Sequence, residues 1–395
     1  MQYRKLPRGD EMISIIGLGN SSMGASGAKE TEATVALALE NGVNYFDMAA
    51  ADAVPFAAFG RAVGSQRDKV CYQVHFGATY DSEGGMYGWT LDLDEIKRSV
   101  DWQLSRLKTD YIDFGFIHCI DEDSDLASAK DGGTIDYLLS LKRQGVVRHI
   151  GMSTHTPETA HAALDLGILD MLMFSINPAY DYVRGEYGSG TVAGRMELYR
   201  RCEAEGVGIS VMKPFAAGQL LDARTSPFRR ALTGVQCIQY ALDKPAVLTV
   251  LPGVSNREEL RGVLGYLTAS EAERDYSVIG TFAPAEAEGV CVYCNHCQPC
   301  PAGLDVGLIN KYYDLARAGD AMARDHYMHL GKKASGCLHC GHCDGRCPFH
   351  VRQSERMSEI AAYFGELAHH GAPYGAPFAF PKTKPNLNKS VLYCA

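Results

Sequence analysis

The residues with the clearest chemical potential are eight of the thirteen cysteines, which fall into two short runs near the C-terminal end. The first run repeats the spacing C-x2-C, and the second reads C-x2-C-x2-C-x3-C. A proline follows each run and ends the turn, because proline cannot donate a backbone hydrogen bond. The runs are Cys291, Cys294, Cys297 and Cys300, then Cys337, Cys340, Cys343 and Cys347.

The spacing of the second run is that of bacterial ferredoxins with two iron–sulfur cubes. In these, three thiolates of a run bind one cube and the fourth binds the other. Zinc is the alternative, because C-x2-C pairs often bind it. Two runs of four cysteines, each closed by Cys-Pro, fit clusters better. We therefore expect two 4Fe–4S clusters, one on Cys291, Cys294, Cys297 and Cys347, the other on Cys337, Cys340, Cys343 and Cys300.

Charge and composition argue against a nucleic-acid-binding protein and against a membrane protein. The 395 residues carry a formal net charge of −9 without any basic run, so nucleic-acid binding is not expected. No stretch reaches about 18 consecutive apolar residues, so no membrane span is expected. We recognise no secretory signal peptide, and compact groups of thiols suit a reducing compartment. We therefore expect a cytoplasmic protein without disulfides.

Over residues 1–280 the sequence alternates between short apolar runs and amphipathic helical patterns, and these elements must position any further reactive side chains. Eight such strand–helix units predict an α/β fold, a (β/α)8 TIM barrel. Residues 281–368 are expected to form a C-terminal α-helical ferredoxin-like iron–sulfur domain. Residues 369–395 read as an extended Pro/Gly-rich tail along this chain or a partner subunit of a homodimer. The predicted strands are Met12–Gly17, Val43–Phe46, Val70–Val74, Tyr111–Ile117, Val146–Met152, Met171–Ile176, Val207–Met212 and Val247–Leu251.

Polar side chains follow several predicted strands, at the barrel end where the chemistry of such folds occurs. Asp47, His75 and His118 each follow a strand, and Asp52 lies one short loop beyond Asp47. We expect these four to converge and to act as catalytic acids and bases. The alternatives are a site for zinc or ferrous iron, or polar groups that only pair with one another.

Three motifs resemble the aldo-keto reductase family: Asn44–Asp47, Arg106–Asp113 followed by His118, and Leu251–Asn256. The whole chain resembles the branch of that family with a C-terminal ferredoxin-like module holding two 4Fe–4S clusters. The resemblance implies a tetrad of Asp, Tyr, Lys and His, in which the Tyr protonates a carbonyl as a nicotinamide delivers hydride. Asp47 and His118 match the tetrad. Asp52 stands in place of the Tyr and His75 in place of the Lys, and no other proton donor is assigned among Tyr80, Tyr87 and Tyr180 in the loops around the mouth.

The same resemblance suggests where a nicotinamide cofactor would bind. Ser153 fits a family position, Asn177 stands where a Gln contacts the carboxamide, and Glu259 falls where a phosphate-binding cation is usual. A carboxylate near a phosphate is unfavourable, so NADP(H) remains an alternative cofactor here. The cofactor-binding candidates are Ser153, Asn177, Lys213, Gly253, Ser255, Asn256 and Arg257.

We therefore expect a redox enzyme of anaerobic metabolism acting on a small organic molecule. Electrons would pass through the two clusters from a redox partner such as a ferredoxin or flavoprotein, and the Asp and His residues would handle protons. One alternative is an NAD(P)H-dependent carbonyl reductase with a rebuilt tetrad. The other is an electron-transfer or scaffold subunit with a catalytically silent barrel.

Overall fold

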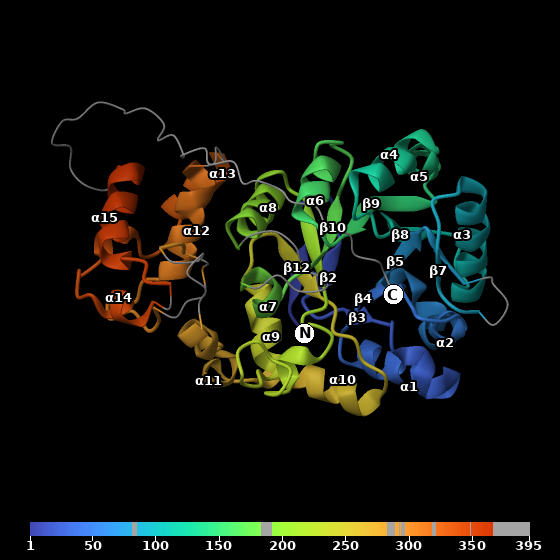
Figure 1. Ribbon diagram of the computed structural model, residues 1–395, viewed down its shortest axis with the longest axis horizontal. Helices are drawn as coiled ribbons and strands as arrows, with labels where there is room; N and C mark the ends of the chain where they lie inside the picture. The colour runs from blue at the N-terminus through green and yellow to red at the C-terminus, as the bar shows by residue number, and fades with distance from the viewer. Residues whose placement is uncertain are drawn as a thin grey trace, which may run out of the picture.

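The computed structural model describes residues 1–80, 85–182, 192–282, 289–291, 293, 297–317, 321–347 and 349–365. Eight parallel strands form one sheet in the order β12-β11-β10-β9-β8-β5-β4-β3 (Figure 1). Parallel bridges between Ile16 and Val250 and between Gly19 and Gly253 close it into a barrel. The predicted (β/α)8 fold is confirmed. The strands are β3 (Leu18–Gly19), β4 (Tyr45–Asp47), β5 (Cys71–Phe76), β8 (Ile112–Ile117), β9 (Val147–Thr154), β10 (Met171–Ser175), β11 (Gly208–Met212) and β12 (Val247–Val250).

The strands are apolar because both of their faces are covered. Every residue of β5 and β8 is buried, as expected where a parallel sheet is packed on both sides. Side chains fill the barrel interior, so it is a packed core and not a pore. The interior cluster is Leu6, Ile13, Tyr45, Cys71, Phe114, Phe116, Met171, Met173, Met212, Leu248 and Leu251.

Helices surround the sheet, and their ends follow local sequence signals. The longest of the barrel helices, α3, begins where the Asp92 side chain accepts the N–H groups of Asp94 and Glu95, and ends at Lys108 in a left-handed conformation. The helices are α1 (Gly27–Glu40), α2 (Val54–Val63), α3 (Leu93–Leu107), α4 (Asp123–Asp131), α5 (Thr134–Arg143), α6 (Pro157–Leu164), α7 (Pro178–Tyr182), α8 (Val192–Ala204), α9 (Gly234–Leu242) and α10 (Arg257–Leu264).

Two hairpins depart from the predicted pattern. The predicted barrel strand over Met12–Gly17 is only partly right: Met12–Ser14 form β2, which pairs antiparallel with β1 (Tyr3–Lys5), whereas Ile16 bridges to β12 and the barrel strand itself is β3. Leu6 and Ile13 of this first hairpin pack into the barrel interior, which the apolar run alone does not reveal. The second hairpin joins β6 (Ala78–Thr79) to β7 (Gly88–Trp89).

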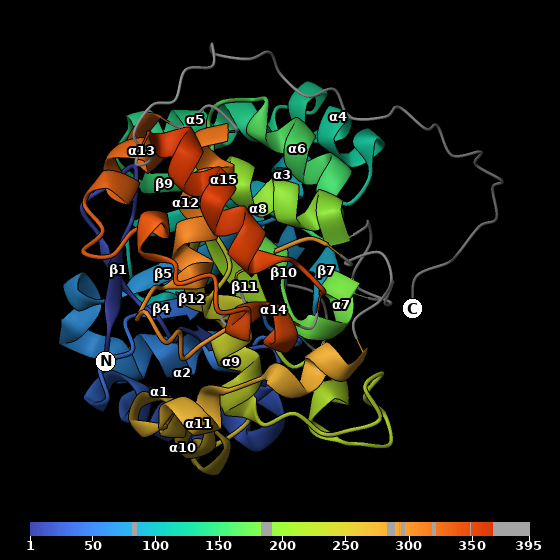
Figure 2. The same ribbon diagram turned by 90° about the vertical axis from the view of Figure 1, so that its left-hand side faces the viewer.

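The C-terminal module is helical and has an apolar core of its own. It follows the short α11 (Glu271–Arg274) and lies beside the barrel (Figures 1 and 2). Arg200 of α8 donates to Asp314 of the module (3.2 Å), and Lys311 pairs with Glu203 (2.6 Å). Its helices are α12 (Val306–Arg317), α13 (Ala321–Met328), α14 (His342–Arg346) and α15 (Gln353–Phe364).

Two further sequence predictions concern a membrane span and the C-terminal tail. No helix among the described residues is long and apolar enough to cross a membrane. The predicted extended tail over 369–395 lies outside the described residues.

Candidate functional site

Three of the four predicted catalytic residues meet at the carboxyl ends of neighbouring strands. Asp47 ends β4, His75 lies in β5, and His118 follows β8. Asp47 Oδ1 lies 2.7 Å from His75 Nε2, and His75 Nδ1 lies 2.8 Å from His118 Nδ1. Gln73 also donates to Asp47 Oδ1 (3.0 Å). Because strands β4, β5 and β8 pair side by side, the sequence positions of the three side chains bring them into one row.

Tyr87 continues this row to the surface. Its hydroxyl lies 2.8 Å from His118 Nε2, and the side chain is 42% exposed. Trp89 of the same hairpin donates its indole N–H to the His118 carbonyl (3.1 Å) and so holds β7 against the mouth. The row therefore runs from the buried Asp47 through His75 and His118 to a phenol that solvent can reach.

The hydrogen bonds of the row can all point the same way. If Tyr87 donates to His118 and His118 donates to Nδ1 of His75, then His75 donates its single N–H, on Nε2, to the Asp47 carboxylate. Burial, and then repulsion by His75, hold the pKa of His118 well below its usual range, so this ring is neutral at rest. Burial raises the pKa of Tyr87, which keeps its proton in place.

Sequence reasoning did not single out Tyr87 from the other loop tyrosines. Tyr80 and Tyr180 are buried, and the Tyr80 hydroxyl accepts the Ala50 N–H (3.0 Å). The positions of the three tyrosines in the sequence are alike. Tyr87 is placed by the β6–β7 pairing that follows it and by its backbone N–H, which donates to the Ala51 carbonyl (3.0 Å).

Asp52 does not join the row among the described contacts. Its carboxylate accepts the Val54 N–H (2.8 Å) at the start of α2. It also lies against Gly24, where an added Cβ would come within 2.1 Å of an Asp52 oxygen. The predicted catalytic role of Asp52 therefore gains no support from the geometry, which instead gives it a role in the loop before α2.

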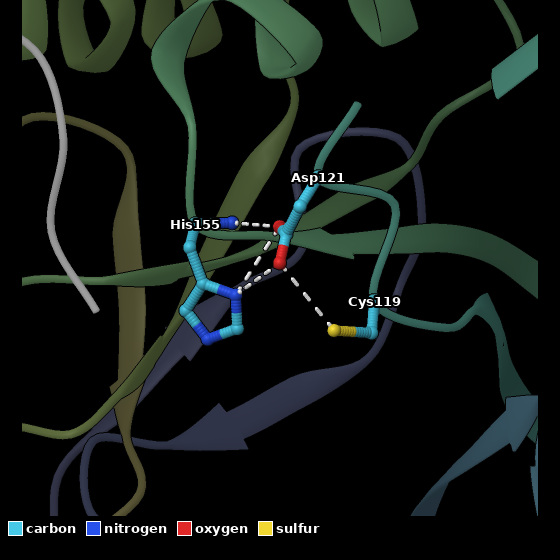
Figure 3. Close-up of side chains that lie close together, drawn as sticks. All are labelled: Cys119, Asp121 and His155. Carbon is cyan, nitrogen blue, oxygen red and sulfur yellow. Dashed lines mark hydrogen bonds and ion pairs between the residues drawn. The ribbon is translucent and has the colours of Figure 1, made fainter. Parts of the chain in front are cut away.

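A second polar cluster lies at the same barrel end and is shown in Figure 3. Asp121 accepts hydrogen bonds from the His155 N–H (2.7 Å) and ring Nδ1 (2.9 Å), and from the Cys119 thiol (3.5 Å). Lys213 Nζ lies 3.0 Å from His155 Nε2. Cys119 and Lys213 both have left-handed backbone angles, with φ of 53° and 54°, an uncommon conformation that often marks functional positions.

Charge in this cluster is balanced between Lys213 and Asp121. Burial opposes ionisation of Asp121, but the hydrogen bonds from the ring and the backbone N–H of His155 hold its pKa at about 2. Burial, together with Asp121, raises the pKa of Cys119 to about 12, so the thiol is neutral. The cluster thus fixes Lys213 and His155 at the mouth, where they can face a polar or anionic substrate group.

The donor set of this cluster also resembles a zinc site. Cys119, Asp121 and His155 offer three ligand atoms within 4.8 Å of one another. Lys213 opposes that use, because an ammonium beside Nε2 needs the ring's lone pair and directs the Nδ1 proton at Asp121. The metal set considered from the sequence was a different one, and three of its members, Asp47, His75 and His118, lie within hydrogen-bond distance of one another.

Two of the predicted cofactor-binding residues are already engaged with the protein. Asn177 donates to the Lys213 carbonyl (2.8 Å) and accepts the Tyr180 N–H (2.9 Å), and its side chain is buried. Ser153 accepts the Cys119 N–H (2.8 Å). These two side chains therefore tie the strand ends together.

The predicted phosphate-binding turn is likewise occupied by carboxylates. Glu259 accepts the Ser255 N–H (2.7 Å), and the Asn256 side chain caps α10. Arg257 is paired with Glu30 through both its backbone and its guanidinium. Gly253 stays exposed beside Gly19, but as they stand the donors of this turn do not fit a cofactor phosphate.

The described cysteines of the two runs gather in part around one pocket, which also includes Cys297 of the other expected set. Five of them line one pocket, together with Leu304 and Met357. The five include all four ligands expected for one cluster, taken from both runs: Cys300, Cys337, Cys340 and Cys343, with Cys297 beside them. Of the other expected set, Cys294 lies outside the described residues. The described cysteines form no disulfides.

An eight-stranded barrel with Asp and His at the strand ends defines a class of barrel enzymes, and the sequence comparison identifies the family. Residues 15–231 match the model of the aldo/keto reductase family. The match covers more than half of the chain, and the chain belongs to that family. It is therefore an oxidoreductase of aldo-keto reductase type, a family whose substrates are small molecules.

Individual relatives are distant. The uncharacterized oxidoreductase YqkF of Bacillus subtilis is 28% identical over 66% of this chain and 89% of its own length. L-galactose dehydrogenase of Arabidopsis thaliana is 22% identical over 71% of this chain and 88% of its own. The aldo-keto reductase AKR11C1 of Bacillus halodurans superimposes with a TM-score of 0.58 at 23% identity, over 72% and 97% of the chains.

One structural relative was solved with a cofactor. An aldo/keto reductase from Klebsiella pneumoniae, in complex with NADP and acetate, superimposes with a TM-score of 0.53 at 19% identity, over 72% of this chain and 96% of that one. At this identity the likeness shows the fold alone. The family match ends at residue 231, before both cysteine runs, so the predicted cluster module stays a prediction.

Proposed function

We propose that this protein interconverts a small carbonyl compound and its alcohol, with the row of Asp47, His75, His118 and Tyr87 moving the proton. The observation that carries the proposal is the unbroken set of contacts, each 2.7–2.8 Å, from a buried carboxylate to an exposed phenol. This is the rebuilt tetrad considered from the sequence, with Tyr87 as the proton donor that Asp52 does not supply.

In the direction of alcohol oxidation, the row acts as a general base. The substrate hydroxyl gives its proton to the Tyr87 oxygen as Tyr87 passes its own to His118 Nε2. His118 passes its Nδ1 proton to His75, which becomes an imidazolium beside the Asp47 carboxylate. In the direction of carbonyl reduction the same steps run backwards and protonate the forming alkoxide.

The carbon-bound hydrogen and its two electrons need a separate donor or acceptor. A nicotinamide supplies hydride when bound, and membership of the family supports that choice. The residues of the phosphate turn do not fit its phosphates as they stand, so we assign no nicotinamide contact. Fluorescence titration of the purified protein with NADPH and NADH tests this cofactor directly.

A second candidate source of electrons is the C-terminal module, and the pocket lined by five cysteines favours it. Cys300, Cys337, Cys340 and Cys343 would hold one 4Fe–4S cluster, and Cys291, Cys294, Cys297 and Cys347 the other. Such clusters store and pass single electrons. The ferredoxin-like character of the module, an external redox partner and a cytoplasmic location belong to this same proposal.

Anaerobic purification followed by iron, sulfide and zinc analysis separates the two sources. We expect about eight irons and eight sulfides per chain, as two four-iron cubes require. Zinc in place of iron would overturn the cluster proposal and leave the barrel chemistry standing.

The barrel chemistry is tested with Tyr87→Phe. A panel of small aldehydes and ketones is assayed with NADPH, NADH or reduced methyl viologen as electron donor. We expect kcat to fall about 10²- to 10⁴-fold, the range of general acid–base catalysis, with unchanged thermal stability. The exposed Tyr3→Phe is the matched control, because Tyr3 bonds only to a surface carbonyl in the described contacts. Full activity of Tyr87→Phe would refute the role of the row.

A further inference from the structure

The two expected cluster sites differ in their relation to the barrel. Cys291 and Tyr293 are buried in the same apolar core as the barrel helices, together with Phe349. Tyr293 accepts a hydrogen bond from Arg200 of α8 (2.5 Å) and donates to Asp314 (2.9 Å). The site that includes Cys291 is therefore the inner one, next to the barrel.

The other site faces outward. Cys340 is exposed, and the neighbouring Leu338 is 66% exposed, more than any other large apolar side chain given for the described residues. Helix α14, which carries Cys343, lies on the side of the module away from the barrel in Figure 1. The pocket that includes Cys300, Cys337 and Cys340 is thus the outer site.

The segment that carries three of the outer-site cysteines is basic in sequence, whereas the chain as a whole is acidic. Residues 329–356 contain five Lys and Arg residues against two Asp and Glu, although the formal net charge of the chain is −9. Lys332 and Lys333 hydrogen-bond to the backbone carbonyls of Ala302 and Leu330. Neither lysine takes part in an ion pair with the residues that the structure describes, so their charges stay available to a partner.

We propose that a small electron-carrier protein with an acidic surface docks over Leu338 and Cys340, with Lys332 and Lys333 at the rim. The inference rests on the proposed clusters and names their partner and port of entry. An exposed apolar centre with a charged rim is typical of protein interfaces, and redox encounters use small ones. In each encounter the carrier is oxidised by one electron and the outer cluster is reduced by one. Two encounters supply the two electrons for one carbonyl reduction, which also takes up two protons from solvent, one reaching the oxygen through the row and the other going to the carbon.

The charge of the rim sets the rate of this encounter. Opposite charges speed association and make it sensitive to salt, because ions screen them over about 10 Å at 0.1 M ionic strength. Reversing two positive charges should therefore slow the encounter without changing the clusters. An apolar-to-polar change at the centre should weaken the complex at all salt concentrations.

The test measures electron entry in the full-length protein, purified anaerobically with its iron and sulfide content determined. A purified acidic ferredoxin, reduced beforehand, is mixed with the protein in a stopped-flow instrument, and cluster bleaching is followed at low and high salt. The variants are Lys332→Glu with Lys333→Glu, and Leu338→Asn. The control is Lys29→Glu with Lys69→Glu, two exposed lysines of the barrel. In a second measurement the reduced protein passes electrons to cytochrome c, a basic protein whose charge is opposite to that of ferredoxin.

We expect the Lys332/Lys333 variant to lose about 10-fold or more in the second-order rate at low salt, and to lose much less at high salt. The control pair should stay within about twofold, and cytochrome c should react faster with the variant than with the wild type. Equal ferredoxin rates in the variant and the control, with clusters intact and reducible by dithionite, would overturn the docking site alone. Binding of RNA, and not of ferredoxin, to the lysines at the rim would also overturn the docking site. Protein without iron and sulfide would overturn the cluster proposal and the docking site with it.

Discussion

Replacing Asp47 by Asn and by Ala separates the proton-moving role of the row from its structural role. Asp47 Oδ1 accepts hydrogen bonds from both His75 and Gln73, and the carboxylate is 5% exposed. Asn keeps an oxygen at this place but removes the charge. Ala removes the acceptor and leaves two buried donors unpaired, each at a cost of about 1–3 kcal/mol.

The charge matters only while His75 carries the extra proton. At the observed separation of 2.7 Å and an effective dielectric constant of ~20, the attraction between imidazolium and carboxylate is about 6 kcal/mol. Loss of even half of it would slow turnover about 100-fold, since each 1.4 kcal/mol is a factor of ten. We therefore expect Asp47→Asn to lower kcat about 10²-fold or more, with its free energy of unfolding within about 1 kcal/mol of the wild type.

The assay pairs steady-state kinetics on the best substrate of the aldehyde and ketone panel with urea unfolding of each variant. We expect Asp47→Ala to lose activity and about 2–4 kcal/mol of stability. Two results would refute the reasoning. Asp47→Asn could retain wild-type kcat, which would remove His75 from the proton route. Alternatively, it could unfold as easily as Asp47→Ala, which would make the carboxylate a purely structural acceptor.

Three further predictions concern packing, pH and cofactor binding. Gly60→Ala places a Cβ 2.4 Å from a backbone oxygen of α3 and should destabilise the fold by about 1–3 kcal/mol. Gly262→Ala, in helix α10, places a Cβ that meets nothing within 4 Å, and it should stabilise that helix by up to about 1 kcal/mol. Thermal unfolding of both variants checks that the two changes in stability have opposite signs. The pKa of Asp121 is lowered to about 2 in the folded state, so its stabilising effect is present above about pH 4 and is lost as the pH falls through 2. The difference in unfolding free energy between wild type and Asp121→Asn, about 1 kcal/mol after allowance for solvent screening, should shrink over that range, and a constant difference would contradict it. Glu259→Ala frees the Ser255 N–H of the phosphate turn and should tighten NADPH binding about tenfold in fluorescence titration. Glu258→Ala is the neighbouring control. Equal NADPH affinities of the two variants would show that Glu259 does not obstruct the turn.

The sequence was sufficient to predict the barrel and the convergence of three side chains. Buried parallel strands are largely apolar on both faces, so a polar residue at the end of an apolar run marks the end of a strand. Asp47, His75 and His118 are such residues. Neighbouring parallel strands end at the same edge, which fixes their proximity without any knowledge of the loops.

The remaining contacts depend on irregular segments, where hydrophobic periodicity gives no position. Asp52 was expected in the row from its place in a family motif, but the loop turns it toward the start of α2. Tyr87 enters the row through a two-residue hairpin pairing that no apolar alternation announces. The contact between Lys213 and His155 joins loops that are 58 residues apart. Each of these outcomes is set by tertiary packing of a loop.

The substitution of His75 for lysine and the use of Tyr87 are two parts of one change. A lysine at this place has a single terminal nitrogen, which can pair with Asp47 and approach a tyrosine close by. An imidazole has two nitrogens on opposite sides of a flat ring, so that one faces Asp47 while the other faces away. In this protein the nitrogen that faces away meets His118, and the free nitrogen of His118 meets Tyr87. In the proposed mechanism, a histidine at position 75 therefore extends the proton route by one further ring, and the proton donor comes from the hairpin at the rim of the mouth and not from the loop that contains Asp52.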